Sequence, residues 1–251
     1  MKSFLLLLAL LGSAPLAAWA APGDLDPTFG SSGTARVGFG AGDDYGVALV
    51  TRNGKYLVAG SSDDAEKTDL IVVRYLSDGS PDPTFGVEGI ARLSSGPQSN
   101  AGASAMAVMS DDRILVAGAD NNVPILGRFL SNGAPDLTFG TNGIVSLPGL
   151  PITSICGIAL QGTKIILCSS FHSASNYHLG LARLNADGTL DATFDGDGIA
   201  RFPILVESFA TGMTTQADGK IVIVGYARDA SLHRAVALAR CNANGVLDAT
   251  F

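Results

Sequence analysis

The chain contains few of the residue types that usually carry catalysis or hold metals and cofactors. Its 251 residues include three histidines, three cysteines and one tryptophan, and only 16% are charged. The histidines, His172, His178 and His233, lack the paired spacing of a zinc site, so neither a zinc centre nor a histidine-bearing triad is predicted. No glycine-rich phosphate loop is present, and the single Trp19 lies near the amino terminus. We therefore expect no catalytic constellation and no cofactor.

The chain also lacks an apolar run long enough to span a membrane. A shorter apolar run lies at the amino terminus. Lys2 precedes an apolar stretch at residues 4–11, and Ala18-Trp19-Ala20 follows as a small-x-small cleavage signal. This arrangement is typical of a secretory signal peptide, and the stretch is too short to span a bilayer. We expect a signal peptide at residues 1–20, cleavage near Ala20, a mature domain at residues 21–251, and a secreted protein, extracellular or periplasmic.

The charge balance narrows the class of partner. The chain has 16 Lys and Arg residues and 23 Asp and Glu residues, which gives a net charge of −7. An acidic surface repels phosphate backbones and anionic lipids, so nucleic acid and membrane insertion are not expected. Apolar residues make up 47% of the chain and glycines number 31, a composition typical of a folded domain with short strands and many turns.

One sequence signature, Asp-x-Thr-Phe, occurs five times. Its phenylalanines are spaced by 56, 54, 55 and 57 residues, so a unit of about 55 residues is copied in tandem. A glycine follows four residues after the phenylalanine, and an arginine at the end of an apolar run precedes it by eleven. The recurring residues are Asp26, Thr28, Phe29 and Gly33; Arg74, Asp82, Thr84, Phe85 and Gly89; Arg128, Asp136, Thr138, Phe139 and Gly143; Arg183, Asp191, Thr193, Phe194 and Gly198; and Arg240, Asp248, Thr250 and Phe251.

Between signatures the sequence alternates short β-favouring runs with turn residues. In the first copy these runs are residues 35–37, 47–50, 56–59 and 70–76, which predicts four strands per copy. Turn residues such as Asn53-Gly54 and Asp218-Gly219 join the second strand to the third in a tight hairpin. A basic residue follows each of these turns, at Lys55, Arg113, Lys164 and Lys220.

Four antiparallel strands at this period predict an all-β fold, a β-propeller-like array of four four-stranded blades. The repeats run approximately over residues 30–85, 86–139, 140–194 and 195–251. A β-solenoid is the alternative fold, although its repeats are usually shorter. A closed four-blade ring, an open array and a homodimer that completes eight blades all remain open at this point.

Three stretches resemble the delta-60 repeat of bacterial secreted proteins. They read GDLDPTFG at residues 23–30, NGKYLVAG at 53–60 and LARLNADG at 181–188. The resemblance covers nearly all of the mature chain and implies a propeller-like fold, but it implies no activity and no catalytic residue. Ser169 departs from the repeat, and the chain stops at Phe251 without the expected glycine. A truncated module of a longer repeat protein is therefore one interpretation.

Each recurring residue has a structural interpretation. We expect the phenylalanines to fill the gaps between blades, and the Asp and Thr side chains to fix the turn by hydrogen bonds to nearby amides. We expect the arginines to lie on the outermost strand and to pair with the repeated aspartates. Asp195 and Asp197 form the one calcium candidate.

The cysteines leave the redox state open. Cys156 and Cys168 fall on the two strands of one hairpin, where a three-residue turn would place them opposite each other on one face. A two-residue turn, as in the other copies, would place them on opposite faces. Cys241 leaves the number odd, so buried and reduced thiols are favoured over a disulfide.

Function is expected on the loops that differ among copies. These are residues 38–46, 94–104, 148–154 and 203–211, and residues 61–69, 119–124, 170–179 and 226–234. Both sets emerge on one face of an up-and-down blade, where variable loops commonly carry binding. We expect a non-catalytic protein with a binding or structural role, whose partner is a protein or a carbohydrate. A propeller-scaffold hydrolase or lyase is the alternative.

Overall fold

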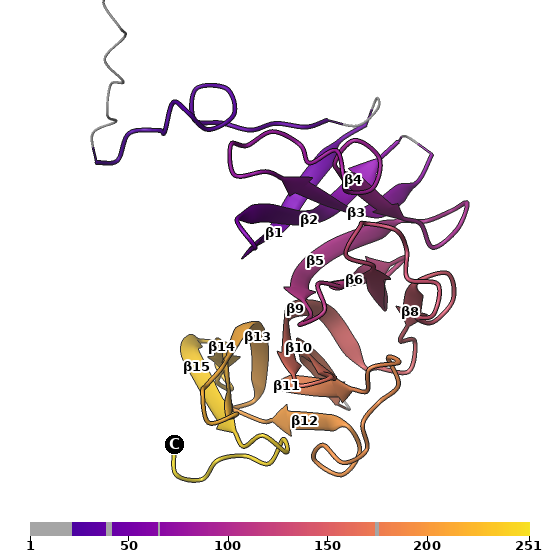
Figure 1. Ribbon diagram of the computed structural model, residues 1–251. Helices are drawn as coiled ribbons and strands as arrows, with labels where there is room; N and C mark the ends of the chain where they lie inside the picture. The colour runs from indigo at the N-terminus through magenta and orange to yellow at the C-terminus, as the bar shows by residue number, and fades with distance from the viewer. Residues whose placement is uncertain (1–21, 39–41, 65, 174–175) are drawn as a thin grey trace, which may run out of the picture.

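The computed structural model describes residues 22–38, 42–64, 66–173 and 176–251, which fold into four successive antiparallel sheets (Figure 1). The predicted signal peptide lies outside the described residues. Within the described part of the chain, no helix is long and apolar enough to cross a membrane. The all-β, propeller-like fold class is therefore confirmed, and the sheets follow one another along an arc that does not close.

The first three sheets are four-stranded meanders. The first contains β1 (Asp44–Arg52), β2 (Lys55–Asp63), β3 (Thr68–Tyr75) and β4 (Ile90–Leu93). The second contains β5 (Ala101–Val108), β6 (Ile114–Asp120), β7 (Val123–Phe129) and β8 (Ile144–Ser146). The third contains β9 (Ile152–Gln161), β10 (Lys164–Ser173), β11 (Asn176–Leu184) and β12 (Ile199–Phe202).

The fourth sheet differs from the others in strand number. It contains β13 (Glu207–Thr215), β14 (Ile221–Arg228) and β15 (Arg234–Cys241), with no fourth strand among the described residues. The prediction of four strands per blade therefore holds for three sheets, and β15 forms a free edge.

The short strand after each signature pairs with the sheet that precedes it. β4 pairs with β3 in the register Leu70↔Leu93, because the signature turn folds the chain back onto its own sheet. Asp82 N–H donates to Arg74 O over 2.9 Å, and Arg74 N–H donates to Gly89 O over 2.9 Å. The arginines therefore lie on the third strand or at its end. The expectation that they lie on the outermost strand is wrong for Arg74, Arg128 and Arg183, whereas Arg240 lies on β15, the outermost strand of the fourth sheet. Residues 35–37 belong to no strand.

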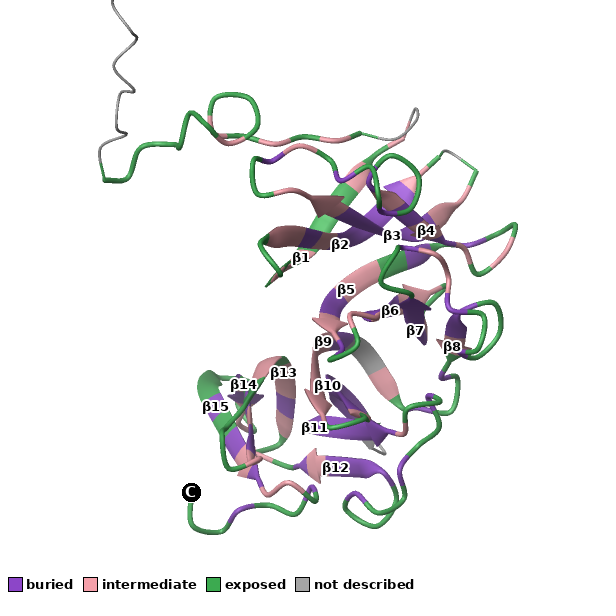
Figure 2. Ribbon diagram, in the orientation of Figure 1, coloured by how far each residue is buried: buried purple, intermediate pink, exposed green. Residues whose placement is uncertain are grey.

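The hydrophobic core lies between neighbouring sheets. Here the forward face of a sheet is the face packed on the next sheet in the chain, and the backward face is packed on the preceding one. Between the first two sheets, Leu70 and Val72 on the forward face pack in one cluster with Met106 and Val116 on the backward face. We call each such contact a closed joint. Figure 2 shows the buried residues concentrated along these joints and the exposed ones at the two ends of the arc.

The first strands of the sheets are β1, β5, β9 and β13, and they contact one another in turn. They lie on the inner side of the arc (Figure 1). In each meander the connection from second to third strand emerges at the same end as the connection to the next sheet. This end, which carries the variable loops, is the loop face. The opposite end carries the tight hairpins and signature turns.

Candidate functional site

Each signature aspartate inside the array has both carboxylate oxygens occupied. In Asp82, Oδ1 accepts from Thr84 N–H over 3.0 Å and from Thr84 Oγ1 over 2.6 Å. Its Oδ2 accepts from Arg74 Nε and from Lys55 Nζ, each over 2.7 Å. Equivalent bonds surround Asp136, Asp191 and Asp248. Among the described residues, the Asp26 carboxylate bonds only Thr28.

These bonds control the ionisation of the aspartates. The hydrogen bond from Thr193, together with bonds from Lys164 and the charge of Arg183, holds the pKa of Asp191 well below its usual range. At Asp248 the hydrogen bond from Lys220 has the largest effect and lowers the pKa in the same direction. The carboxylates are therefore ionised and saturated by donors, which leaves them poorly suited to act on a substrate.

The signature arginine and phenylalanine join one sheet to the next. The Arg74 guanidinium lies 4.4 Å from the centre of the Phe85 ring, and its Nη1 donates to Ser131 O of the second sheet over 2.8 Å. Arg128 and Arg183 make the same contacts with the sheets that follow them. Phe85, Phe139 and Phe194 are fully buried.

The calcium candidate is partly occupied by protein groups. Asp197 Oδ1 accepts from Ile199 N–H over 2.8 Å, and Oδ2 lies 3.2 Å from Arg201 Nη1. Burial, with the nearby charge of Asp197, raises the pKa of Asp195. The described residues contain no group of three potential metal ligands, so calcium binding here stays a prediction.

The cysteine pair departs from the sequence expectation. The hairpin turn has two residues, with Gln161 opposite Lys164, yet a bulge in β9 beside Cys168 brings Cys156 Sγ to 3.1 Å from Cys168 Sγ. The prediction that a two-residue turn separates them on opposite faces is therefore wrong. Both thiols and Cys241 are free. The hydrogen bond between the two thiols lowers the pKa of Cys156, and the same contact, together with burial, raises the pKa of Cys168.

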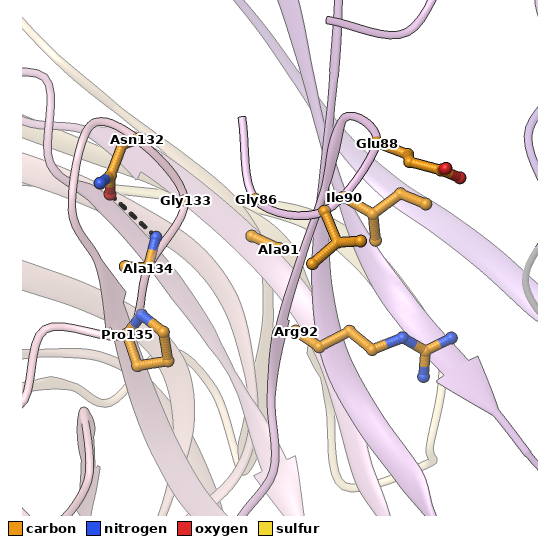
Figure 3. Close-up of a pocket in the computed structure, with 10 residues that line it drawn as sticks. Gly86, Glu88, Ile90, Ala91, Arg92, Asn132, Gly133, Ala134 and Pro135 are labelled. Atoms are coloured by element: carbon orange, nitrogen blue, oxygen red, sulfur yellow. Dashed lines mark hydrogen bonds between the residues drawn. The ribbon is translucent and has the colours of Figure 1, made fainter. Parts of the chain in front are cut away.

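One pocket lies at the first closed joint, on the side of the signature turns (Figure 3). It has a volume of about 620 Å³ and is lined by Gly86, Ala91, Gly133 and Pro135, among others. Glu88 and Arg92 supply its only charged side chains. A single carboxylate without a second acid or base gives this pocket no evident hydrolytic chemistry.

The loop face carries a column of aromatic rings that crosses from the third sheet to the fourth. Ring centres are 5.0 Å apart between His172 and Tyr177, 5.2 Å between Tyr177 and Phe209, and 5.1 Å between Phe209 and Tyr226. His172 is exposed and the other three are half-buried. His172 and His178 lie on β10 and β11, so the prediction of a loop over residues 170–179 is wrong for these two histidines.

Two arginines and two carboxylates surround this column. The Arg228 guanidinium lies 5.1 Å from the Phe209 ring, and that of Arg234 lies 4.7 Å from the Tyr226 ring. Glu207 Oε2 is 3.3 Å from Arg228 Nη1, and Asp229 Oδ2 is 3.2 Å from His233 Nδ1. Within the described part of the chain, Arg234 has no carboxylate partner.

Sequence reasoning did not find this cluster as a site, because its members come from five strands and a loop and do not recur among the copies. Tyr226 directly follows Gly225 near the end of the second strand of its sheet. The equivalent positions in the other sheets hold small residues, Ser61, Ala119 and Ser170. That departure from the repeat is the one signal in the sequence that points to the fourth sheet.

Family comparison identifies the repeat. The model of a domain of unknown function described as a beta-propeller, DUF5122, matches residues 51–85, 110–139, 164–194 and 216–251, together more than half of the chain. No curated protein sequence matches.

Solved structures share the fold at low identity. A protein of unknown function from Dyadobacter fermentans is 11% identical with a TM-score of 0.54; the match covers 78% of this chain and 53% of that one, so the chain spans about half its length. An alpha-L-arabinofuranosidase from Clostridium thermocellum is 11% identical, with a TM-score of 0.44 and coverage of 83% and 72%. A GH43 endo-arabinanase from Bacillus licheniformis is 16% identical, with a TM-score of 0.44 and coverage of 79% and 74%.

These comparisons correct the expected function. Several of the similar solved structures are glycoside hydrolases, and this finding goes against the expectation of a non-catalytic binding or structural protein. At these identities the likeness is one of fold alone. No residue role is carried over from those enzymes.

Proposed function

The chain belongs to the DUF5122 beta-propeller family, whose function is unknown, and we propose that it is a hydrolase acting on a carbohydrate that carries carboxylate groups. The observation that carries this proposal is the pair Arg228 and Arg234, held against aromatic rings on the loop face of an otherwise acidic chain. Guanidinium groups bind carboxylates through two parallel hydrogen bonds, and stacking on a ring fixes their orientation.

The carboxylates beside the arginines supply the chemistry. Hydrogen bonds from the backbone amides of His233 and Ser231 lower the pKa of Asp229, so this side chain is ionised at neutral pH and suits a base or nucleophile. Glu207 is the second carboxylate, oriented by Arg228. Two carboxylates that flank the scissile bond are the usual machinery of glycoside hydrolysis.

The test is release of reducing ends from a panel of polymers. The panel contains acidic polysaccharides (polygalacturonate, alginate and hyaluronan) and neutral ones (arabinan and xylan). We expect cleavage of an acidic polymer, with losses of roughly 10²–10⁴-fold in Asp229→Asn and Glu207→Gln. Arg234→Ala should raise KM more than it lowers kcat, because it removes substrate binding.

Arg52→Ala is the matched control, since Arg52 is an exposed arginine paired with Asp112 at the opposite end of the sheets. It should leave activity unchanged. Absence of cleavage across the whole panel, or full activity in both carboxylate variants, would overturn the proposal.

We further propose that the repeat is the delta-60 repeat and that the protein is exported. Support comes from the recurring motif and from the residue pattern of 1–20. Protein recovered outside the cytoplasm with Ala21 as its first residue is the expected result. Retention of Met1 in exported protein would contradict it.

A further inference from the structure

The forward face of the fourth sheet is exposed at positions that are buried in every closed joint. Val236 and Leu238 take the places that Leu70 and Val72 hold in the first sheet, four and two residues before the arginine. Leu70 and Val72 are fully buried, whereas Val236 is 83% exposed and Leu238 51%. Since burial of such a side chain stabilises by about 1.5–3 kcal/mol, this face lacks a cover.

The backward face of the first sheet is open in the complementary way. Leu49 pairs with Val58 as Met106 pairs with Val116, yet Leu49 is 63% exposed and Met106 only 7%. Between this face and the segment around Phe29 lies a pocket of about 810 Å³. The two ends of the array therefore carry the two halves of a joint.

The signature arginine of the fourth sheet makes no hydrogen bond to another sheet among the described residues, unlike the arginines at the closed joints. Arg240 bonds Asp248 but, among the described residues, no carbonyl of a following sheet. Phe251 lies 4.7 Å from the Arg240 guanidinium and is 60% exposed, in contrast to the buried Phe85. Ser77 holds the place in the first sheet that Ser131, the acceptor for Arg74, holds in the second.

Side-chain sizes at the two ends are complementary. In closed joints Ser61 Oγ accepts from Ala103 N–H over 2.8 Å, and Ser170 Oγ accepts from Ala210 N–H over 2.9 Å. The equivalent of these serines on the fourth sheet is Tyr226, and the equivalent of these alanines on the first is a glycine, opposite Gly60 in the register. A large side chain on one end thus meets the smallest residue on the other.

Charge is complementary as well. In the first closed joint, Thr68 lies beside Asn100 in a parallel bridge, and Thr68 N–H donates to Ser99 O over 2.8 Å. The residue equivalent to Thr68 on the fourth sheet is Arg234, and the one equivalent to Asn100 on the first is Asp43. The joint would place a guanidinium next to a carboxylate.

From these observations we propose that the forward face of the fourth sheet binds the backward face of the first sheet of a second copy of this chain. The three closed joints fix the arc, and this arc leaves its own two ends apart (Figure 1). Two copies joined head to tail around a two-fold axis would bury all four free faces, and Phe251 of each copy would displace Phe29 of the other from the turn at Asp78. Closed symmetry then leaves no surface for further growth. The assembly does not require hydrolysis, but its interface includes Arg234 and Tyr226 of the proposed substrate site. Oligomeric state and polymer cleavage are measured separately, so failure of one proposal is distinguished from failure of the other.

Light scattering coupled to size exclusion, over a hundredfold range of concentration, tests the proposal. We expect twice the mass of one chain, and the mass of one chain in the double variant V236D/L238D. Because both positions are exposed in the single chain, the charges should leave its circular dichroism and melting temperature unchanged. Leu137→Asp, at a position 71% exposed away from these faces, is the control and should stay dimeric.

Charge reversal identifies the partner face. Arg234→Asp and Asp43→Arg should each weaken dimerisation roughly tenfold, and the double variant R234D/D43R should restore it. The proposal would be overturned by the mass of one chain at every concentration or by masses that grow without limit. A double variant that dimerises more weakly than either single variant would also overturn it.

Discussion

Closed joints and free ends are built from the same residue types but differ in what those residues do. In a closed joint, Phe139 is fully buried, and the arginine above it donates to a carbonyl of the next sheet. At the free end, Phe251 keeps its arginine but is 60% exposed. The comparison teaches that the signature completes its ion pairs within one sheet, whereas its phenylalanine is buried only when another sheet follows.

The largest contrast is expected from removing a signature phenylalanine. Phe139→Ala should destabilise the protein by about 3–5 kcal/mol, because it opens a cavity inside a closed joint. Phe251→Ala should change the free energy of unfolding by only about 0.5 kcal/mol, because its ring is already exposed. Urea denaturation at a dilution where the copies are separate measures both. Equal losses would show that Phe251 is buried in the single chain.

The aspartates give a contrast that depends on pH. The folded-state pKa of Asp191 is depressed, so its contribution to stability is complete above the unfolded pKa of about 3.9 and is lost as the pH falls below it. Asp191→Asn should cost about 2–3 kcal/mol at pH 7 and should flatten the acid decline. Asp26→Asn should alter neither by a comparable amount, because Asp26 is exposed and pairs with no arginine in the described part of the chain. Melting temperatures measured from pH 7 to pH 2 test this prediction. Identical pH profiles for Asp191→Asn and Asp26→Asn would contradict it.

A smaller effect is expected from a single bond across a joint. Ser61→Ala removes the acceptor for Ala103 N–H and leaves a half-buried donor unsatisfied, which should cost about 1–2 kcal/mol. Ser80→Ala, which removes an exposed hydroxyl that bonds only within its turn, is the control. If both variants unfold at the same urea concentration, the hydrogen bond between the sheets makes no net contribution to the free energy of unfolding.

The smallest effect concerns Phe29, which packs against Tyr56 with ring centres 5.6 Å apart. Gly30 N–H donates to Asp78 O as Gly86 N–H donates to Asn132 O, so Phe29 stands where the Phe251 of a second copy would pack. Phe29→Ala should therefore strengthen dimerisation a few-fold without changing the fold. Sedimentation equilibrium measures it, and weaker association would contradict the shared position.

The sequence predicted the repeat and most of the strands because they recur among the copies, and it predicted the loop face because the loops there differ among the copies. It could not predict which sheet β4 joins, because a four-residue strand such as Ile90–Leu93 has the same pattern whether it begins one sheet or ends another. The backbone bonds of Asp82 and Arg74 decide that. The bulge that brings Cys156 to Cys168 is likewise invisible in residue spacing. The aromatic column escaped prediction because Tyr177 and Tyr226 meet only through Phe209.

The signature donates hydrogen bonds across each closed joint, and the acceptors of these bonds are main-chain carbonyls. Arg74 reaches Ser131 O, Arg183 reaches Ala243 O, and Gly86 N–H reaches Asn132 O. A carbonyl is present whatever the side chain, so a sheet accepts any neighbour that has the same turn. The array is therefore modular: a unit can be duplicated or deleted by recombination without redesign of the contacts beside it, and length can vary while the ion pairs stay intact.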